Sequence, residues 1–335
     1  MRPRLAVLVT VLVLALALPA AAGAQSPGPT LQSERARILA YWTAGRIAQA
    51  IPRDFERSSS GQLVPKAKPG GGGSGAVKGA SWTGDGIITT QSGRILFTMG
   101  GLDYICSGSV IDDSSESNGY STVLSAGHCV FDAVAGWATN WMYIPRFDDA
   151  PSYDCASAYY GCWTATGLAA HERFVTAGGF NDQAVAVDFA FARVGLGGKT
   201  AVGTLELDAT THGYGLKVGG VALTDTLWAF GYPAAGRYKG KDLTYCKGAL
   251  INDPYGAKAW GMACNVTGGS SGGPWLADTT NPGTLEGRVA SLNSYGYSGL
   301  TYMFGPKFTA DTLTIQGDAI DGTATSGVSQ VRNLP

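Results

Sequence analysis

A short stretch with the sequence GGSSGGP, at residues 268–274, restricts what this chain can fold into more than any other feature. Its four glycines permit positive φ angles and a close approach of neighbouring backbone. A serine held on such a bend presents its hydroxyl beside converging backbone N–H groups, which is the arrangement that acyl transfer needs. A flexible glycine-serine loop is the alternative interpretation, so other parts of the chain must decide.

The order of residues along the chain excludes one class of hydrolase. With Ser270 or Ser271 in the centre, the stretch fits the G-x-S-x-G elbow of α/β-hydrolases, in which the catalytic histidine follows the serine. All three histidines of this chain lie before the stretch: His128, His171 and His212. The orders that remain are His, Asp, Ser and Asp, His, Ser.

The composition favours a turn-rich β protein. Of the 335 residues, 45% are hydrophobic, 15% are charged and 49 are glycine, so the chain can bury a sizeable core in one or two domains. A net charge of −1 gives no reason to expect nucleic acid or an anionic membrane as a partner. The six cysteines and three histidines lack the spacing of a zinc site. We therefore expect disulfides in an oxidising compartment, and neither a metal nor a cofactor.

Residues 1–24 have the three regions of a secretory signal peptide. Arg2 and Arg4 provide the basic region, residues 5–18 are almost entirely apolar, and Ala-Gly-Ala at residues 22–24 provides the cleavage site. A membrane anchor is the alternative, but the apolar run is short for a membrane span. We expect a secreted, extracellular protein that has no membrane association once the signal peptide is removed.

Residues 25–80 differ in composition from the remainder of the chain. Residues 31–51 have a loosely helical pattern, and Pro65, Pro69 and the glycine-rich run at residues 70–75 then predict a linker without preferred structure. We interpret the region as a propeptide joined to the rest by a flexible, cleavable linker. A tethered, disordered leader is an alternative that the sequence leaves open.

From residue 81 onward, short apolar runs alternate with clusters of Gly, Asn, Asp and Ser, which is typical of an all-β sandwich or barrel. We expect an N-terminal barrel at residues 81–200, a C-terminal barrel at 201–320 and a flexible tail at 321–335. The glycine-rich residues 195–203 form a plausible seam between the two halves. The expected strands include the runs at residues 87–90, 94–97, 122–124, 185–194, 226–230 and 313–315.

One histidine and two carboxylates are candidates to complete a triad. His128 lies in LSAGHC, directly after an expected strand and beside small residues that leave its ring accessible. Asp188 begins the alternating run DFAFARV, which would place a carboxylate near a barrel rim, where it could orient the histidine. Asp182 competes with it, but the preceding GGFN is typical of an exposed turn. We favour Asp188.

Together these motifs resemble a known family. LSAGHC at His128, DFAFA at Asp188 and GSSGGP at Ser271 look like the three signatures of chymotrypsin-like serine proteases, in the right order and 60 and 83 residues apart. Ser270, where digestive members have Asp, resembles the secreted bacterial glutamyl-endopeptidase-like branch. The resemblance covers roughly residues 81–309. It implies two six-stranded antiparallel β-barrels, with the active site in the cleft between them.

The resemblance also implies a role for each residue of the site. Ser271 would attack the scissile carbonyl, and His128 would act as general base and then as general acid. Asp188 would fix the tautomer of the histidine. The backbone N–H groups of Gly269 and Ser271 would bind the oxyanion.

By the same resemblance, a substrate pocket would be lined by Asn265, Ser291 and Asn293. Asn265 has no negative charge to pair with Lys or Arg, and Ala290 stands in the region where glutamyl-specific relatives use a histidine. We therefore expect a preference for an uncharged residue before the scissile bond. Proximity suggests the disulfides Cys106–Cys129, Cys155–Cys162 and Cys246–Cys264, although six cysteines allow 15 connectivities.

The function that we expect is that of a secreted serine endopeptidase, a monomer that hydrolyses protein or peptide substrates through an acyl-enzyme intermediate. Two alternatives remain open. A catalytically idle protease-fold protein used for binding or adhesion would not react with a labelled fluorophosphonate. An esterase on the same fold would be distinguished by its turnover of esters and not of peptides.

Overall fold

The computed structural model describes residues 31–57, 63–64, 79–115, 117–149, 154–279, 281, 283–284 and 287–335. The signal peptide expected at residues 1–24 and the linker expected at 70–75 lie outside the described residues. Within the described ranges, no helix is long and apolar enough to cross a membrane.

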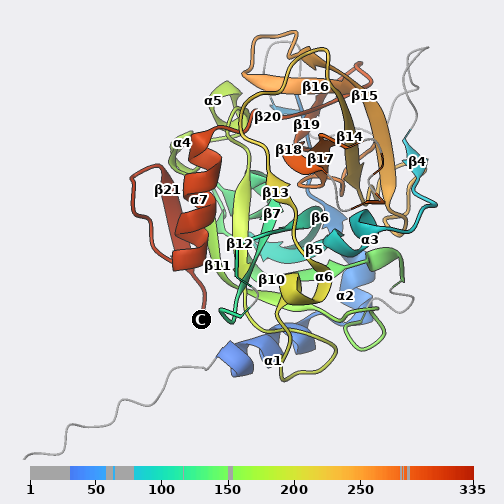
Figure 1. Ribbon diagram of the computed structural model, residues 1–335. Coiled ribbons are helices and arrows are strands. Elements are labelled where there is room, and N and C mark those ends of the chain that lie inside the picture. Colours follow the sequence, from blue (N-terminus) through green and yellow to red (C-terminus); the bar gives the residue numbers. More distant parts are fainter. Residues whose placement is uncertain are drawn as a thin grey trace, which may run out of the picture.

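The first half of the fold is a closed barrel of six antiparallel strands (Figure 1). The strands follow one another around the barrel in the order β6, β5, β10, β11, β12 and β7, and β7 pairs with β6 to close it. Apolar side chains from the strands fill its interior, including the fully buried Trp141, Leu168 and Phe191. The bounds are β5 Ser92–Met99, β6 Leu102–Ile111, β7 Ser121–Ser125, β10 Thr139–Pro145, β11 Trp163–His171 and β12 Ala190–Val194.

The second half is a half-barrel whose strands are ordered β18, β17, β14, β15, β16 and β20. Its two ends face each other where the Ser291 hydroxyl donates to the Pro306 carbonyl at 2.8 Å. The expectation of an all-β, two-barrel fold is confirmed. The bounds are β14 Thr226–Gly231, β15 Thr244–Asn252, β16 Ala259–Ala263, β17 Pro274–Ala277, β18 Arg288–Leu292 and β20 Tyr302–Pro306.

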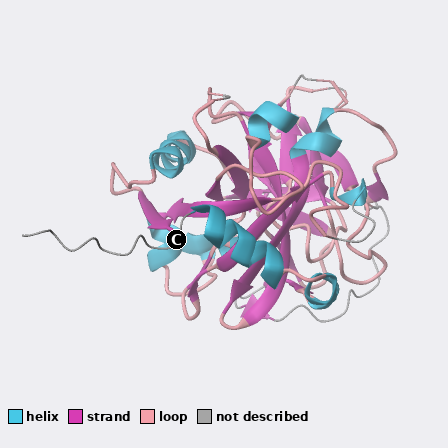
Figure 2. Ribbon diagram, turned by 90° about the horizontal axis from the view of Figure 1, so that it is seen from below, coloured by secondary structure: helices cyan, strands magenta, loops and turns pink. Residues whose placement is uncertain are grey.

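Helices are few and lie around the outside of the strands (Figure 2). One of them, α3, occupies residues 87–90, for which the sequence predicts a strand. The Thr89 and Thr90 hydroxyls donate to the carbonyls of Gly86 and Ile87, three residues back, which is a bond that threonine can form within a helix. The helices are α1 Leu31–Tyr41, α2 Ala44–Gln49, α3 Ile87–Gln91, α4 Glu172–Thr176, α5 Asp182–Val185, α6 Leu207–Thr211 and α7 Ala310–Asp321.

The C-terminal region differs from our expectation in two ways. Residues 313–315 lie in α7 and not in a strand, because Thr309 and Thr312 form a capping box and Gly322 ends the helix in the left-handed conformation. The expected flexible tail at residues 321–335 contains β21, Ser329–Asn333, which pairs antiparallel with β11. The C-terminus is therefore attached to the first barrel.

The residues before the barrels are ordered against both of them (Figure 1). After α1 and α2, strand β1 (Ile51–Pro52) pairs in parallel with β6 of the first barrel. Strand β2 (Phe55–Arg57) then pairs in parallel with β19 (Tyr295–Tyr297) of the second sheet. We call residues 31–57 the leader segment. It therefore runs from the first barrel to the second sheet.

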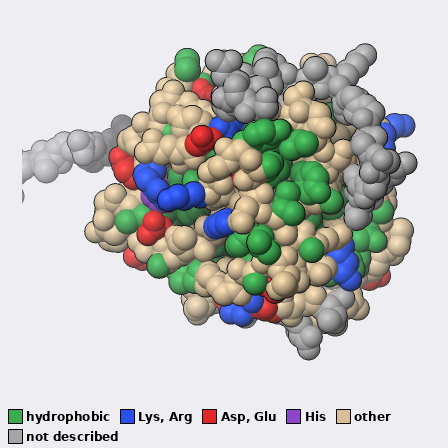
Figure 3. All heavy atoms as spheres, turned by 90° about the horizontal axis from the view of Figure 1, so that it is seen from above, with side chains coloured by type: hydrophobic (Ala, Val, Ile, Leu, Met, Phe, Trp, Pro, Cys, Tyr) green, Lys and Arg blue, Asp and Glu red, His purple; other side chains and the backbone are tan. Residues whose placement is uncertain are grey.

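Of the remaining short strands, three lie at the margins of the second sheet and two pair with each other in a separate sheet. Three disulfides are present, with the same pairs that proximity in the sequence suggests. On the face seen from above Figure 1, hydrophobic side chains gather near the middle and charges of both signs lie around them (Figure 3). The strands are β3 Leu63–Val64, β4 Ala80–Ser81, β8 Phe131–Asp132, β9 Gly136–Trp137 and β13 Gly215–Leu216.

Candidate active site

Pairing of two barrel strands brings His128 and Asp188 together. His128 lies in a short 3₁₀ turn after β7, and Asp188 lies two residues before β12. Because Ala190 pairs with Ser125, these two strand ends are neighbours. The Asp188 carboxylate accepts the His128 backbone N–H at 2.8 Å, and its other oxygen lies 2.8 Å from Nδ1 of the ring. The carboxylate is completely buried, which keeps water from competing for the ring.

A third group holds the same carboxylate. The Ser294 hydroxyl donates to Oδ2 of Asp188, the oxygen that faces the histidine ring. The competing acid, Asp182, is elsewhere: it lies at the start of α5 and forms an ion pair with Arg57 of the leader segment. Of these two acids, Asp188 contacts the histidine and Asp182 contacts Arg57.

The second ring nitrogen of His128 is available for chemistry. Nε2 is buried and has no hydrogen-bond partner among the described residues. The rings of Phe55 and Phe180 stand edge-on to the imidazole, with centroid separations of 5.1 and 5.5 Å. A base with one nitrogen oriented by a carboxylate and the other unoccupied can accept a proton from a nucleophile.

Hydrogen bonds hold two backbone carbonyls of the loop that contains Ser271. These bonds fix the direction of the N–H groups in the same two peptide units. The Gly268 carbonyl accepts from the N–H of Ala234 at 2.7 Å, and the Ser270 carbonyl accepts from the N–H of Gly273 at 3.0 Å. In a trans peptide the N–H points opposite to the C=O. The N–H groups of the next residues along the chain, Gly269 and Ser271, are thus directed away from these bonds.

Neither of these two N–H groups donates a hydrogen bond within the described part of the chain. Gly269 has φ 93°, a conformation that side chains rarely adopt, so the turn depends on glycine at this position. The Gly269 carbonyl accepts from the Ser107 hydroxyl at 2.8 Å and from Arg94 at 3.4 Å. Together these bonds hold the loop in place from the side of the first barrel.

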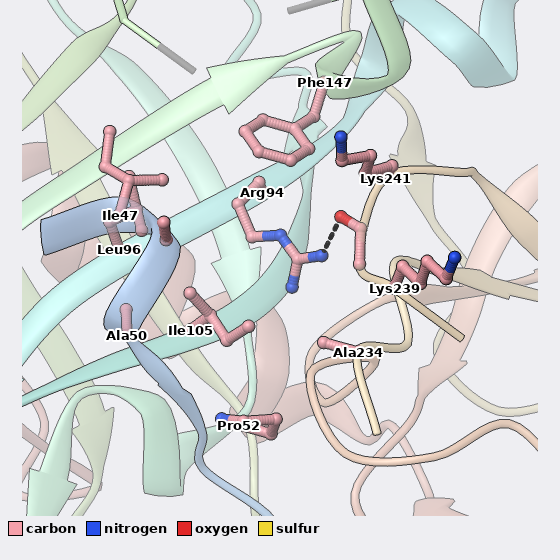
Figure 4. Close-up of a pocket in the computed structure, with 12 residues that line it drawn as sticks. Ile47, Ala50, Pro52, Arg94, Leu96, Ile105, Phe147, Ala234, Lys239 and Lys241 are labelled. Carbon is pink, nitrogen blue, oxygen red and sulfur yellow. Dashed lines mark hydrogen bonds between the residues drawn. The ribbon is translucent and has the colours of Figure 1, made fainter. Parts of the chain in front are cut away.

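Arg94 is a buried cation beneath this loop. Its guanidinium donates to the Gly240 carbonyl and lies over the rings of Phe147 and Tyr232. It lines a cavity of about 380 Å³ between α2 and residues 239–241 (Figure 4). Burial lowers the pKa of Arg94 to about 9, so the group still carries its charge at neutral pH.

A cluster of His128 with Cys106 and Cys129 has the proximity of a metal site, with ligand atoms within 4.8 Å of one another. The two sulfurs form a disulfide with each other, however. Zinc and similar ions bind the thiolate form of cysteine, so this cluster lacks the ligands that they require.

Comparison with known proteins identifies the fold and the family. No family model and no curated protein matches the chain. Among solved structures, the protease Anisep from Arthrobacter nicotinovorans is 32% identical over 72% of this chain and 98% of its own, with a TM-score of 0.58. AL20, a thermostable serine protease from an extremophilic microorganism, is 28% identical over 72% of this chain and all of its own, with a TM-score of 0.56.

The chain belongs to the chymotrypsin-like serine proteases. A Glu endopeptidase shares the fold at 17% identity, over 74% of this chain and 98% of its own, with a TM-score of 0.53. In this chymotrypsin-like serine protease, the residues that the sequence singled out come from both halves of the fold. His128 and Asp188 belong to the first barrel, and the Ser271 loop precedes β17 of the second.

The structure does not support two of the three pocket residues expected in this serine protease. Ser291 and Asn293 are completely buried. Ser291 donates to Pro306, while the Asn293 amide donates to the carbonyls of Phe230 and Ser270 and accepts from Trp275. The polar groups of both side chains are hydrogen-bonded to the protein and do not face a substrate. Ser291 joins the two ends of the second sheet, and Asn293 holds the loop that contains Ser271.

Asn265 remains a prediction as a pocket residue. Its side-chain oxygen accepts from the backbone N–H of Gly79 at 2.7 Å and from the Tyr238 hydroxyl at 3.2 Å. Residue 79 is the first described residue after the expected linker. Asn265 therefore contacts the end of the region that we interpret as propeptide and linker.

Three residues that support the site of this protease were not found by sequence reasoning: Ser294, Ser107 and Arg94. Ser294 comes directly after the SLN run expected to line the pocket, so its position next to that run was an available signal. Ser107 comes directly after Cys106, but nothing local distinguishes it from Ser109 two residues later. In the sequence, Arg94 is a charged residue at the start of an expected strand and nothing indicates burial. Its burial is evident only in the folded structure.

Proposed function

We propose that this protein is a secreted serine endopeptidase that cleaves protein or peptide substrates with Ser271, His128 and Asp188. The observation that carries the proposal is the pair of contacts between Asp188 and His128, which leaves Nε2 unoccupied on the side of the ring away from the carboxylate. The similarity to serine proteases gives the class of reaction. The three disulfides support an oxidising, extracellular location.

Acylation begins with attack of the Ser271 hydroxyl oxygen on the scissile carbonyl. His128 accepts the hydroxyl proton at Nε2, while its Nδ1–H donates to Asp188, which stabilises the positive charge that forms on the ring. The same histidine then donates the proton to the leaving amine. Water hydrolyses the acyl-enzyme by the reverse use of these groups.

The oxyanion of the tetrahedral intermediate is assigned to the N–H groups of Gly269 and Ser271. Both are directed away from anchored carbonyls and donate to no other described residue. Donors that are fixed before the reaction need no reorganisation when charge develops on the substrate oxygen. The buried guanidinium of Arg94 donates to the Gly269 carbonyl at 3.4 Å and so helps to hold this loop.

A labelled fluorophosphonate tests the proposal, because it reacts with an activated serine. Wild-type protein should be labelled at Ser271, and Ser271→Ala and His128→Asn should not be labelled. His212→Asn is the matched control: this histidine lies outside the site at φ 60°, a conformation that asparagine tolerates. Equal labelling of the two histidine variants would contradict the assignment. The absence of labelling in every form of the protein would favour a binding protein.

A further inference from the structure

Residues 51–57 of the leader segment cross the candidate active site from one barrel to the other. Ile51 and Pro52 pair with Tyr104 and Ile105 of β6 in the first barrel. Three residues further on, Phe55 pairs with Tyr295 of β19 in the second sheet. The chain between these two pairings has to pass His128 and the Ser271 loop.

The middle of this crossing contacts the proposed general base. Nε of Arg53 donates to the backbone carbonyl of His128 at 2.7 Å, and its other end forms an ion pair with Asp132 at 2.5 Å. The ring of Phe55 stands on the edge of the His128 imidazole and stacks on Phe180 at a centroid distance of 4.4 Å. Phe55 therefore packs directly against the ring of the proposed base.

The crossing also contacts the nucleophile loop. A methyl group added to Gly268 would lie 2.8 Å from the Cβ atom of Asp54 and 2.9 Å from that of Pro52. Such distances are shorter than van der Waals contact, so the leader segment lies directly on the backbone of Gly268. This glycine is three residues before Ser271, and its carbonyl sets the direction of the Gly269 N–H.

The end of the crossing is anchored by Arg57. This residue is 1% exposed, and its guanidinium lies 5.6 Å from the ring centroids of both Tyr295 and Tyr297. It forms an ion pair with Asp182, and its carbonyl accepts from the N–H of Ser298 at 3.0 Å. A buried cation with this many contacts holds β2 in register on β19.

The segment occupies the site without being positioned for cleavage. Attack by Ser271 requires a substrate carbonyl in contact with the N–H groups of Gly269 and Ser271. Within the described part of the chain, no residue of the segment accepts a hydrogen bond from either group. Residues 51–57 therefore lie against His128 and Gly268 but do not present a scissile bond to Ser271.

We infer that residues 51–57 are a built-in inhibitor, which occupies the edge of β19 and contacts both His128 and Gly268. This inference rests on the proposed function. In the sheet order, β19 lies between β20 and β2, so removal of β2 exposes the edge of β19. An exposed edge offers unpaired N–H and C=O groups to which a peptide can add as a new strand. The leader and a substrate compete for this edge.

Contacts made by α1 and by the turn that follows it hold the inhibitory residues in place. Arg35 of α1 is buried and donates to three backbone carbonyls of the first barrel region, those of Cys162, Gly198 and Thr200, each at 2.9 Å. Nε1 of Trp42 donates to the Asn140 carbonyl at 2.6 Å. Because these contacts lie outside residues 51–57, they keep the leader bound even where a substrate displaces part of β2.

The test uses the full chain, with residues 71–74 of the linker replaced by the recognition sequence of an added protease. Fluorophosphonate labelling of the intact chain should be slow. After the linker is cut, labelling should stay slow in concentrated protein and accelerate on dilution, as the leader dissociates. If the uncut chain is labelled as fast as the cut and diluted chain, the inference is overturned.

Substitutions in the leader provide a second measurement. Phe55→Ala should raise the labelling rate of the uncut chain by about tenfold, because loss of an aromatic anchor commonly weakens an interface by that factor or more. Gln49→Ala, at an exposed position of α2, is the matched control and should leave the rate unchanged. Arg57→Gln, which removes the ion pair with Asp182, replaces Phe55→Ala if that variant does not fold. Equal rates for all these proteins would also overturn the inference.

Labelling distinguishes failure of the inhibitory role from failure of the proposed function. If the proposed function is wrong, no form of the protein is labelled, whether the linker is cut or intact. If only the inhibitory role is wrong, Ser271 is labelled rapidly in the intact chain, and labelling is independent of dilution.

Discussion

The Ser107 hydroxyl donates a hydrogen bond of 2.8 Å to the carbonyl oxygen of Gly269. The same hydroxyl accepts the N–H of Tyr232 at 2.9 Å, and the Ser107 backbone N–H donates to the Ser271 carbonyl at 2.7 Å. One residue of the first barrel is thus bonded to both ends of the segment that forms the proposed oxyanion hole. The conformation of the proposed oxyanion hole is therefore stabilised by Ser107 of the first barrel as well as by the glycines of the loop itself.

Ser107→Ala should lower kcat by about tenfold and leave KM nearly unchanged, because a less rigid loop stabilises the transition state less well than it binds the substrate. The measurement is steady-state kinetics on the cut chain with one peptide substrate. Ser109→Ala is the matched control: this serine lies on the same strand, is completely buried, and its hydroxyl has no partner among the described residues. Similar losses in both variants would show that Ser107 has only a structural role.

Asp188→Asn should lower kcat by about 10⁴, because the amide favours the wrong tautomer of His128. Asp182→Asn in the cut chain should have little effect on kcat, since this carboxylate contacts Arg57 of the leader and not the histidine. Kinetics of both variants, with circular dichroism to check folding, provide the test. Full activity in Asp188→Asn together with loss in Asp182→Asn would reverse the assignment.

The position of the cut in the linker should have little effect on kcat. The residue just before the nucleophile is Ser270, which is uncharged and whose hydroxyl donates to the Thr267 carbonyl at 2.8 Å, so it offers no carboxylate to a new N-terminal ammonium. A buried ammonium would lack its partner there and would be costly. Chains cut at successive positions between residues 70 and 78 should have nearly equal kcat values. Activity restricted to one cut position would show that the N-terminus is inserted.

Asp208 should make stability depend on pH. Burial raises the pKa of this carboxyl to about 7, although the Ser121 hydroxyl donates to it at 2.8 Å. The folded state therefore binds the proton more tightly than the unfolded state, whose carboxyl has a pKa of about 4. The stability from this group is fully present below about pH 4 and is lost as the pH rises through about 7. Wild-type stability relative to Asp208→Asn should fall over this range in urea unfolding. A difference that is independent of pH would contradict the assignment.

The sequence predicted the parts of the site that short motifs contain. The glycines around Ser271, the small residues before His128 and the alternating run after Asp188 each reflect a local requirement of the backbone. The contact between Ser294 and Asp188 joins residues 106 positions apart, and no local pattern contains it. Contacts of this kind depend on how the two barrels pack against each other.

The same distinction explains the expectations that were wrong. Residues 313–315 are Leu, Thr and Ile, a composition that predicts a strand. The capping box at Thr309 and Thr312 and the glycine at 322 stabilise a helix there instead. For the leader, the sequence indicated helix in residues 31–51. It contained no sign that residues 51–57 pair with one strand from each barrel, because these residues have no regular alternation.

The three carbonyl bonds of Arg35 have a consequence for where the protein would become active. A tethered leader is present at the same local concentration however dilute the protein is. Once the linker is cut, the leader remains bound only while its concentration exceeds the dissociation constant, and these buried bonds make that constant small. A molecule cut close to the cell that produced it would stay inactive in a crowded space. Activity would begin only after the two pieces had diffused apart. The distance from the producing cell would therefore determine when the protein becomes active.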